Sequence, residues 1–290
     1  MAQTLAQHRS GWTIRRSPAV AGLGTSLAIT LVWLSLLVLL PLAALALRPW
    51  EKGLDHVLDV VLDPRTLAAL RLSFAVALVA ALVAAVSGAV CAWVLVRYRF
   101  PGRDMVDALI DLPFALPTAV AGIALATLYA PTGLLGGVIE AQFGIKTAYT
   151  PVGIGIALVF VGFPFVVRAI QPVLQDLEPE LEEAAATLGA SRWRTFRQVL
   201  APALAPALVS GTATAFARAV GEYGSVIFIA GNLPLVSEIA PLLIVIRLEE
   251  FDYAGAAAIG LVMMVLALAI LIAINGLQLM AARRGLGPRR

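Results

Sequence analysis

Long stretches without a charged side chain constrain this sequence more than any other feature. A helix of roughly 20 residues crosses the hydrocarbon of a bilayer, which is about 30 Å thick. Five stretches are that long and carry no Asp, Glu, Lys or Arg, and in a sixth only Arg218 and Glu222 interrupt the apolar residues. With 60% hydrophobic and 13% charged residues, the chain has more apolar surface than one water-soluble core could bury. The predicted spans are Ser17–Leu47, Leu72–Val96, Leu112–Ile139, Thr147–Val167, Ala203–Ala230 and Tyr253–Ala282.

These spans predict an all-α, polytopic membrane protein with six transmembrane helices. Strands of membrane barrels are shorter and alternate between apolar and polar residues, whereas a helix pairs its backbone N–H and C=O groups within one segment. The first span, at 17–47, follows a basic tail at 1–16, which could suggest a signal peptide. Its apolar run is about twice the usual length, so we interpret it as a retained anchor. A second basic tail ends the chain at 283–290.

The distribution of Lys and Arg predicts the orientation of the spans. Two alternating sets of loops and tails hold 14 and 6 of these residues, and the richer set includes both ends of the chain. Basic loops stay on the cytoplasmic side, so both termini are predicted to be cytoplasmic. The same bias accounts for the basic pI of about 9.3. No basic patch is interleaved with aromatic residues, so we expect no nucleic-acid partner, and lipid is the expected surrounding.

A cytoplasmic loop at 176–202 is too rich in sequence signals to be a simple connector. Pro179 stands where a helix can begin, and the acidic residues that follow lie in the first turns, where the helix dipole favours anions. Gly189 is placed to end this helix as a residue with a positive φ. A second helix then carries three arginines. We predict a short helix, a turn and a second helix, with small residues exposed to another protein.

The same loop resembles the EAA loop of bacterial ABC importer permeases. The resemblance is carried by Glu183-Ala184-Ala185, by Gly189 and by Pro202, although the residue before the proline is Ala201 where the family usually has Leu. It implies a type I ABC importer permease fold and a coupling helix that docks on an ATPase subunit. The chain has no GxxxxGK[ST] phosphate loop. We therefore expect no cofactor in this chain, with ATP and Mg bound by two separate ATPase subunits.

Arg218 and Glu222 stand four residues apart within the fifth predicted span. In a helix they share one face with the small and polar residues Thr214 and Ser225. Charges at this depth are costly and mark function by default. Two interpretations stay open: the pair fastens helices by mutual neutralisation, or it belongs to the translocation pathway.

The residues around this pair resemble the T subunit of sulfate/thiosulfate permeases, over roughly 66–277. The similar segments are the ones that begin Ala217-Arg-Ala-Val-Gly-Glu-Tyr-Gly-Ser, Val236-Ser-Glu-Ile-Ala-Pro and Asp111-Leu-Pro-Phe-Ala-Leu-Pro. The resemblance implies a five-helix importer domain at 66–277 in the bacterial inner membrane. It also implies a tetrahedral divalent oxyanion as cargo, a homologous W-type permease subunit and a periplasmic sulfate-binding protein.

Three other functions remain to be considered for a chain of this kind. Molybdate or tungstate permeases share a similar Arg-Ala-x-Gly-Glu pattern and remain the alternative within transport. An intramembrane enzyme would need a catalytic set inside the spans, but His8 and His56 lie outside them and no carboxylate pair lies at mid-depth. A secondary transporter with inverted repeats does not fit a six-span chain with an EAA loop. The chain is therefore predicted to be a non-catalytic transport subunit.

Overall fold

The computed structural model describes residues 23–281, with side chains for residues 24–276. The predicted tails at 1–16 and 283–290, and the start of the first span at 17–22, lie outside the described residues. Every regular element in the described part is helical, so the predicted all-α class is confirmed there. The described residues form two units, one ending at Leu47 and one beginning at Arg48.

The first unit is one helical path that widens in its middle. It consists of α1 (Leu23–Leu34), a π-helical turn η2 (Ser35–Leu39) and α2 (Leu40–Leu47). Pro41 follows the π turn by two residues, and a proline lacks the N–H and crowds the carbonyl four residues earlier. A wider turn relieves that crowding. The side chains of residues 24–44 are exposed on all sides of this helix, as expected for a segment that faces lipid.

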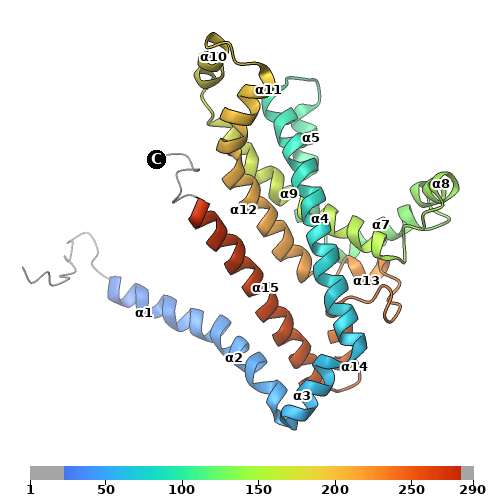
Figure 1. Cartoon of the computed structure of the whole chain (residues 1–290). Helices are drawn as coiled ribbons and strands as arrows, with labels where there is room; N and C mark the ends of the chain where they lie inside the picture. The colour runs from blue at the N-terminus through green and yellow to red at the C-terminus, as the bar shows by residue number, and fades with distance from the viewer. Residues whose placement is uncertain (1–22, 282–290) are drawn as a thin grey trace, which may run out of the picture. The chain divides into compact units, whose positions relative to one another are not determined.

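The second unit holds the remaining helices, which Figure 1 draws from blue to red along the chain. Four are long: α4 (Pro64–Arg97), α9 (Pro151–Gln175), α12 (Ala201–Val220) and α15 (Tyr253–Ala281). The shorter ones are η3 (Arg48–Lys52), α3 (Gly53–Leu62), α5 (Arg103–Ile110), α6 (Leu112–Ala115), α7 (Thr118–Tyr129), α8 (Leu134–Phe143), α10 (Pro179–Thr187), α11 (Arg192–Thr195), η4 (Phe196–Leu200), α13 (Val226–Ile229) and α14 (Ala240–Glu249).

Between residues 23 and 281, five helical stretches are long and apolar enough to cross a membrane, and a bent pair would make six. The five are Gly24–Leu62, Pro64–Arg97, Pro151–Gln175, Arg192–Val220 and Tyr253–Gly276. The predicted third span at Leu112–Ile139 is broken in two places and is not one straight helix. Pro117 separates α6 from α7, and a turn at Pro131 bends α8 away from α7 by 43°. Both prolines remove a backbone hydrogen bond, which an apolar composition alone does not reveal.

The core lies where α4, α9 and α12 pack together. The buried face of α4 is built mostly of alanine and other small residues, with Ala77, Ala80, Ala84 and Ala92 buried at helical spacing. Lipid tails are as apolar as side chains, so helices in a membrane gain most from the close van der Waals contact that small residues permit. The small residues of α4 therefore hold the bundle together more than large apolar side chains do.

The second unit has two distinct ends along α4. The end where α4 begins carries α3 and α14, and we call it the α3 end. The other end, at Arg97, carries α5, α10 and α11, and we call it the α10 end (Figure 1). Helix α4 runs from the α3 end to the α10 end and packs on α9 and α12 between them, so it can connect the two ends.

Candidate functional site

Helix α10 forms as the sequence predicts. It begins at Pro179, with acidic residues in its first turn, and ends at Thr187. Gly189 follows with φ of 77°, a left-handed conformation that glycine adopts without strain. The Gly189 N–H donates to the carbonyl of Ala186 at 2.9 Å and the Ala190 N–H to that of Ala185 at 3.0 Å. This pair of bonds is a Schellman motif, so the predicted helix and its end are confirmed.

The exposed surface of this loop combines small and large apolar residues. Glu183 and Ala184 are exposed and Ala185 is half-buried. Leu188 and Trp193, on either side of the Gly189 turn, are 87% and 69% exposed. Exposed apolar side chains beside small residues are typical of a surface that another protein covers. The loop therefore exposes an apolar surface at the α10 end.

Pro202 lies where the loop becomes a membrane helix. The chain runs from α11 through the π-helical turn η4 into α12, and Pro202 is in the first turn of α12. As with Pro41, a π turn ends two residues before the proline. The second helix of the loop and the fifth span are thus one helical rod, so a displacement of the loop acts directly on α12.

The predicted ion pair of the fifth span is present, but in a different local structure. Helix α12 ends at Val220, so Glu222 lies in a turn after the helix and not within it as predicted. Arg218 Nη1 is 2.6 Å from Glu222 Oε2. The Glu222 side chain is 2% exposed, whereas that of Arg218 is 39% exposed. Gly221 is the C-cap of this helix, and the low helix propensity of glycine makes an end at this position less costly than a longer helix.

Ser225 completes the surroundings of the Glu222 carboxylate. Its backbone N–H and its hydroxyl both donate to Glu222 Oε1, each at 3.0 Å. Helix α7 touches the same turn through Gly122, where a Cβ atom would lie 2.4 Å from the Ser225 carbonyl oxygen. Only glycine permits so close an approach. The carboxylate is thus fully engaged by groups of its own turn, and α7 covers that turn.

Thr214 does not belong to this cluster. Its hydroxyl donates to the carbonyl of Ser210 in its own helix at 2.9 Å, and its side chain is exposed. Thr214 and Ser225 therefore lie in different surroundings, and the polar stripe expected from helical spacing does not form. Arg218 has no further hydrogen bond or ion pair among the residues that the structure describes. Its remaining N–H groups can engage an anion, because a guanidinium carries five donors in a fixed plane.

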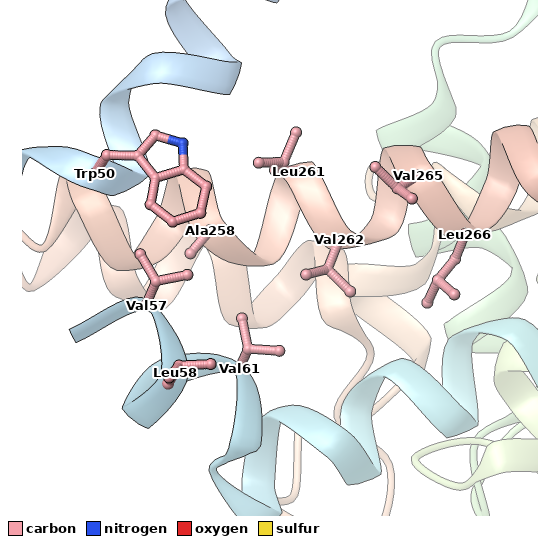
Figure 2. Close-up of a pocket in the computed structure, with 9 residues that line it drawn as sticks. All are labelled: Trp50, Val57, Leu58, Val61, Ala258, Leu261, Val262, Val265 and Leu266. Atoms are coloured by element: carbon pink, nitrogen blue, oxygen red, sulfur yellow. The ribbon is translucent and has the colours of Figure 1, made fainter. Parts of the chain in front are cut away.

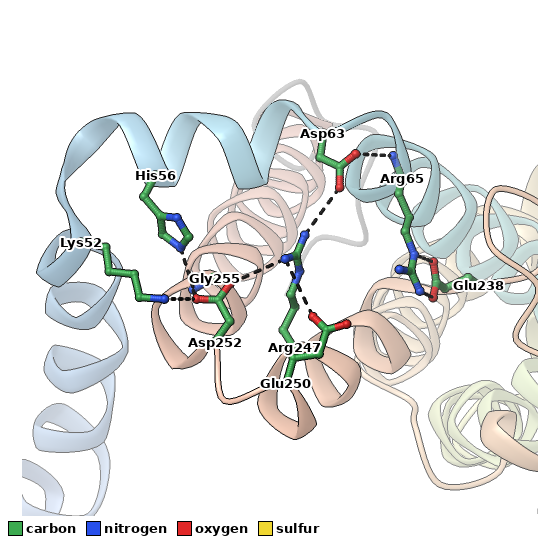
Figure 3. Close-up of polar contacts among 9 residues, drawn as sticks. All are labelled: Lys52, His56, Asp63, Arg65, Glu238, Arg247, Glu250, Asp252 and Gly255. Atoms are coloured by element: carbon green, nitrogen blue, oxygen red, sulfur yellow. Dashed lines mark hydrogen bonds and ion pairs between the residues drawn. The ribbon is translucent and has the colours of Figure 1, made fainter.

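A second charged pair, at the α3 end, escaped the sequence analysis. Arg65 Nε and Nη2 donate to Glu238 Oε2 and Oε1, both at 2.7 Å, and the Glu238 side chain is 1% exposed. Figure 3 shows this two-pronged contact beside a further network around Arg247 and Asp252. The two partners are 173 residues apart, so no local spacing reveals the pair. A glutamate just before an apolar helix was the one available signal.

The neighbouring network ties α3 to the loop before α15. Asp252 accepts from Lys52 Nζ at 2.7 Å and from the backbone N–H of Gly255 at 3.2 Å, and His56 Nε2 lies 3.2 Å away. Burial raises the pKa of Asp252, but the Lys52 ammonium and the Gly255 N–H outweigh it, so that pKa lies below its ordinary value. The carboxylate stays ionised and holds the two elements together.

The α10 end has its own arginine centre, also absent from the predictions. Arg168 of α9 donates to both carboxylate oxygens of Asp111 and to Asp107 Oδ1, at 2.7 to 2.9 Å. Burial raises the pKa of Asp107, and the hydrogen bonds from Arg168 and Gln171 more than offset this, so the pKa lies below its usual range. The two aspartates at i, i+4 spacing were the signal that sequence reasoning could have used. This centre fastens α5 and α6 to α9.

An apolar groove of about 310 Å³ lies between η3, α3 and α15. Figure 2 shows that α15 lines one side of it and that Trp50 and α3 line the other. The residues involved are Trp50, Val57, Leu58, Val61, Ala258, Leu261, Val262, Val265 and Leu266. Apart from the indole N–H of Trp50, the side chains that line the groove carry no polar group that could select a ligand. Within the described part of the chain, no three His, Cys, Asp or Glu side chains are grouped to hold a metal ion.

Comparison with known proteins places these features in a family. Residues 84–285 match the model of the family described as binding-protein-dependent transport system inner membrane component. The chain is 48% identical to the sulfate transport system permease protein CysT of Salmonella typhimurium, over 92% of this chain and 96% of that protein. It is 47% identical to CysT of Synechocystis sp., over 86% and 87% of the two chains.

A solved structure shares the fold at low sequence identity. It is the crystal structure of a bacterial ABC transporter involved in the import of the acidic polysaccharide alginate. The match has a TM-score of 0.74 at 16% identity and covers 88% of this chain and 94% of that one. A likeness at this identity concerns the fold, and it confirms that the helices are arranged as in an ABC importer permease.

Proposed function

Because this chain belongs to the family of binding-protein-dependent transport system inner membrane components, together with the CysT permeases, we propose that it carries sulfate across the membrane. The family makes it a multi-pass inner-membrane permease subunit of an ABC importer and not an enzyme. The observation that carries the cargo assignment is the 48% identity to a sulfate permease, which extends over 92% of the chain. Thiosulfate, as a similar divalent oxyanion, is an expected second cargo.

Arg218 is proposed as the residue that offers positive charge to the passing anion. Its guanidinium is part-exposed while its partner Glu222 is buried. Glu222 holds Arg218 through one Nη group and is itself held by Ser225. An anchored arginine with unused donors suits a tetrahedral oxyanion that must bind briefly and then leave, because charge-assisted contacts are strong but the pair with Glu222 moderates them.

The loop at 176–202 is proposed to couple this movement to ATP hydrolysis. Glu183, Ala184, Ala185 and Gly189 would form the docking surface for an ATPase subunit, and Pro202 would join that surface to α12. The uninterrupted rod from Arg192 to Val220 supports this role, since it ends two residues before Glu222. Movement of the docked loop would then reach the anion-binding turn along one helix.

The proposed complex contains this chain, a homologous W-type permease subunit, two ATPase subunits that bind ATP and Mg, and a periplasmic sulfate-binding protein. A crystal structure of an alginate ABC transporter with a periplasmic protein shares the fold at 17% identity and a TM-score of 0.74. The α10 end would face the cytoplasm and the α3 end the periplasm, with both termini cytoplasmic.

Uptake by the purified complex tests the cargo. The complex, reconstituted in vesicles with binding protein, should accumulate labelled sulfate only with ATP, and unlabelled thiosulfate should compete. Excess molybdate should not compete. ATP-driven molybdate uptake without sulfate uptake would instead assign the chain to the molybdate permeases and overturn the proposal.

Substitution of Gly189 tests the coupling loop. Gly189→Val puts a branched side chain at a positive φ and should distort the end of α10, so ATP hydrolysis should continue without uptake. Gly102→Val is the matched control, because Gly102 has φ of 83° at the same end of the molecule but lies outside the loop. Normal uptake by the Gly189 variant in fully assembled complexes would contradict the coupling role.

Labelling of single cysteines tests the orientation. In a Cys91→Ala background, Thr187→Cys should react only with reagent on the cytoplasmic side, and Asp59→Cys only from outside. The expectation follows from the 14 to 6 distribution of Lys and Arg. Reaction of the Thr187 variant from the periplasm would invert the topology.

A further inference from the structure

A direct contact joins the last residue of α4 to the proposed coupling helix. Arg97 Nη2 forms an ion pair and hydrogen bond with Glu182 Oε1, near the middle of α10. The side chains are 24% and 31% exposed, so both lie mostly away from water. Among residues 24–276, no other side chain of α10 forms a hydrogen bond or ion pair with another helix. Glu182 precedes the EAA motif and is not among its residues.

Aromatic rings extend this contact into the second helix of the loop. The Arg97 guanidinium lies 5.3 Å from the ring centre of Trp93, one turn earlier in α4. Trp93 meets Phe196 edge to face at 6.2 Å, and Phe196 stacks on Trp193 at 5.6 Å. A cation over an aromatic face and offset aromatic pairs are both attractive. One continuous set of contacts therefore joins α4, α10, α11 and η4.

The location of this cluster gives it two routes into the membrane. The rod from Arg192 to Val220 connects the loop covalently to α12. The Arg97–Glu182 contact connects it to α4, which packs along both α9 and α12 in the core. An exposed ion pair contributes little to stability, but one that is mostly shielded and packed on a ring fixes the position of the helix that carries it.

We infer that Arg97 is a positioning residue that passes movement of the coupling helix to α4, in parallel with the covalent route through α12. Glu182 receives the movement on α10, and Trp93 keeps the guanidinium in line between α4 and Phe196. The inference rests on the proposed function of α10 as the ATPase-docking helix. It predicts that breaking the contact lowers the number of anions moved per ATP without stopping ATP hydrolysis.

The test measures sulfate taken up per ATP hydrolysed in vesicles that contain the whole complex. Arg97→Gln and Glu182→Gln should each lower this ratio about fivefold, the lower end of typical coupling between sites. The double variant should lower it no further than either single variant, because both remove the same contact. The exchanged pair, Arg97→Glu with Glu182→Arg, should recover part of the ratio.

Two neighbouring residues serve as matched controls. Arg99→Gln and Glu180→Gln remove the same charges from exposed positions two residues away, and neither side chain forms an ion pair in the described structure. Both should keep the wild-type ratio. Gly189→Val in the same assay reports on the coupling helix itself.

Each outcome decides a different claim. If Gly189→Val uncouples transport while the Arg97 and Glu182 variants keep the wild-type ratio, the inference about Arg97 is wrong. The proposed coupling role of α10 is then still supported. If these two variants reduce only the amount of assembled complex, with an unchanged ratio per complex, Arg97 is merely structural and the inference is again wrong. If Gly189→Val is also fully coupled, the proposed function of α10 fails first.

Discussion

Two arginine–glutamate pairs in the same bundle differ in how fully the arginine is used. Arg65 grips both carboxylate oxygens of Glu238 with two of its nitrogens, at 2.7 Å each. Arg218 approaches one oxygen of Glu222, whose other oxygen belongs to Ser225. Both glutamates are buried and both arginines are part-exposed. Arg65 therefore has a structural role, whereas Arg218 retains N–H donors for the proposed contact with the transported anion.

The two ion pairs also differ in how far apart their partners lie in the sequence. The Arg65–Glu238 contact joins the start of α4 to the segment before α14, so its loss would weaken the attachment of that segment, which a hydrogen bond from Ala240 N–H to Ser73 Oγ also holds. The Arg218–Glu222 contact closes a local turn at the end of α12. A long-range pair is thus expected to govern stability, and the local pair is expected to govern transport.

Removing the arginine of the long-range pair should have the largest effect on stability. Arg65→Gln leaves the buried Glu238 carboxylate without its partner, which should cost about 3 kcal/mol. Arg218→Gln should cost less, because Glu222 keeps its two bonds from Ser225. Thermal unfolding of the detergent-solubilised complex measures both. Equal losses of thermal stability would show that the two ion pairs contribute equally to stability, which would contradict the comparison.

Lysine substitutions should sharpen the contrast at smaller amplitude. Arg65→Lys keeps the charge but loses the two-pronged geometry, so we expect a loss of about 1 kcal/mol or more. Arg218→Lys needs to meet only one carboxylate oxygen and should retain stability while changing the affinity for sulfate. The comparison would be wrong if the Arg218→Lys variant unfolded at a lower temperature than the Arg65→Lys variant.

Ser225→Ala should have the smallest effect on stability. It removes the hydroxyl donor to Glu222 but leaves the backbone N–H bond in place, which should cost about 1 kcal/mol. Uptake should fall modestly, because Glu222 holds Arg218 less firmly. Ser210→Ala is the control, since Ser210 lies in the same helix as Arg218 and its side chain is exposed. A control variant that loses as much uptake would argue against the positioning role of Ser225.

Local signals allowed much of the α10 loop to be predicted. Pro179 and Gly189 act through their own backbone restrictions, so the helix and its Schellman end follow from nearby residues alone. The long spans follow from composition for the same reason, since lipid requires helices wherever the chain is apolar. The π turns before Pro41 and Pro202 also have a local cause, namely the proline that follows each of them.

Features that depend on tertiary contacts could not be predicted in the same way. The break between α7 and α8 at Pro131 and the end of α12 at Gly221 have local causes, but both lie within apolar runs, so hydropathy alone does not place them. The pairing of Arg65 with Glu238 and of Arg97 with Glu182 depends on which helices meet, which no spacing along one chain specifies. The Arg218–Glu222 pair was found because it is local, even though its helix ends earlier than expected.

The double variant Arg218→Gln with Glu222→Gln tests the central claim most directly. Removing both charges leaves no unpaired charge, so assembly should exceed that of Glu222→Gln alone. The measurement is ATP-driven uptake of labelled sulfate, normalised to the amount of complex in the membrane. Our account predicts recovered assembly with strongly reduced uptake. Wild-type uptake by the double variant would contradict it and would reduce Arg218 to a fastener of its own turn.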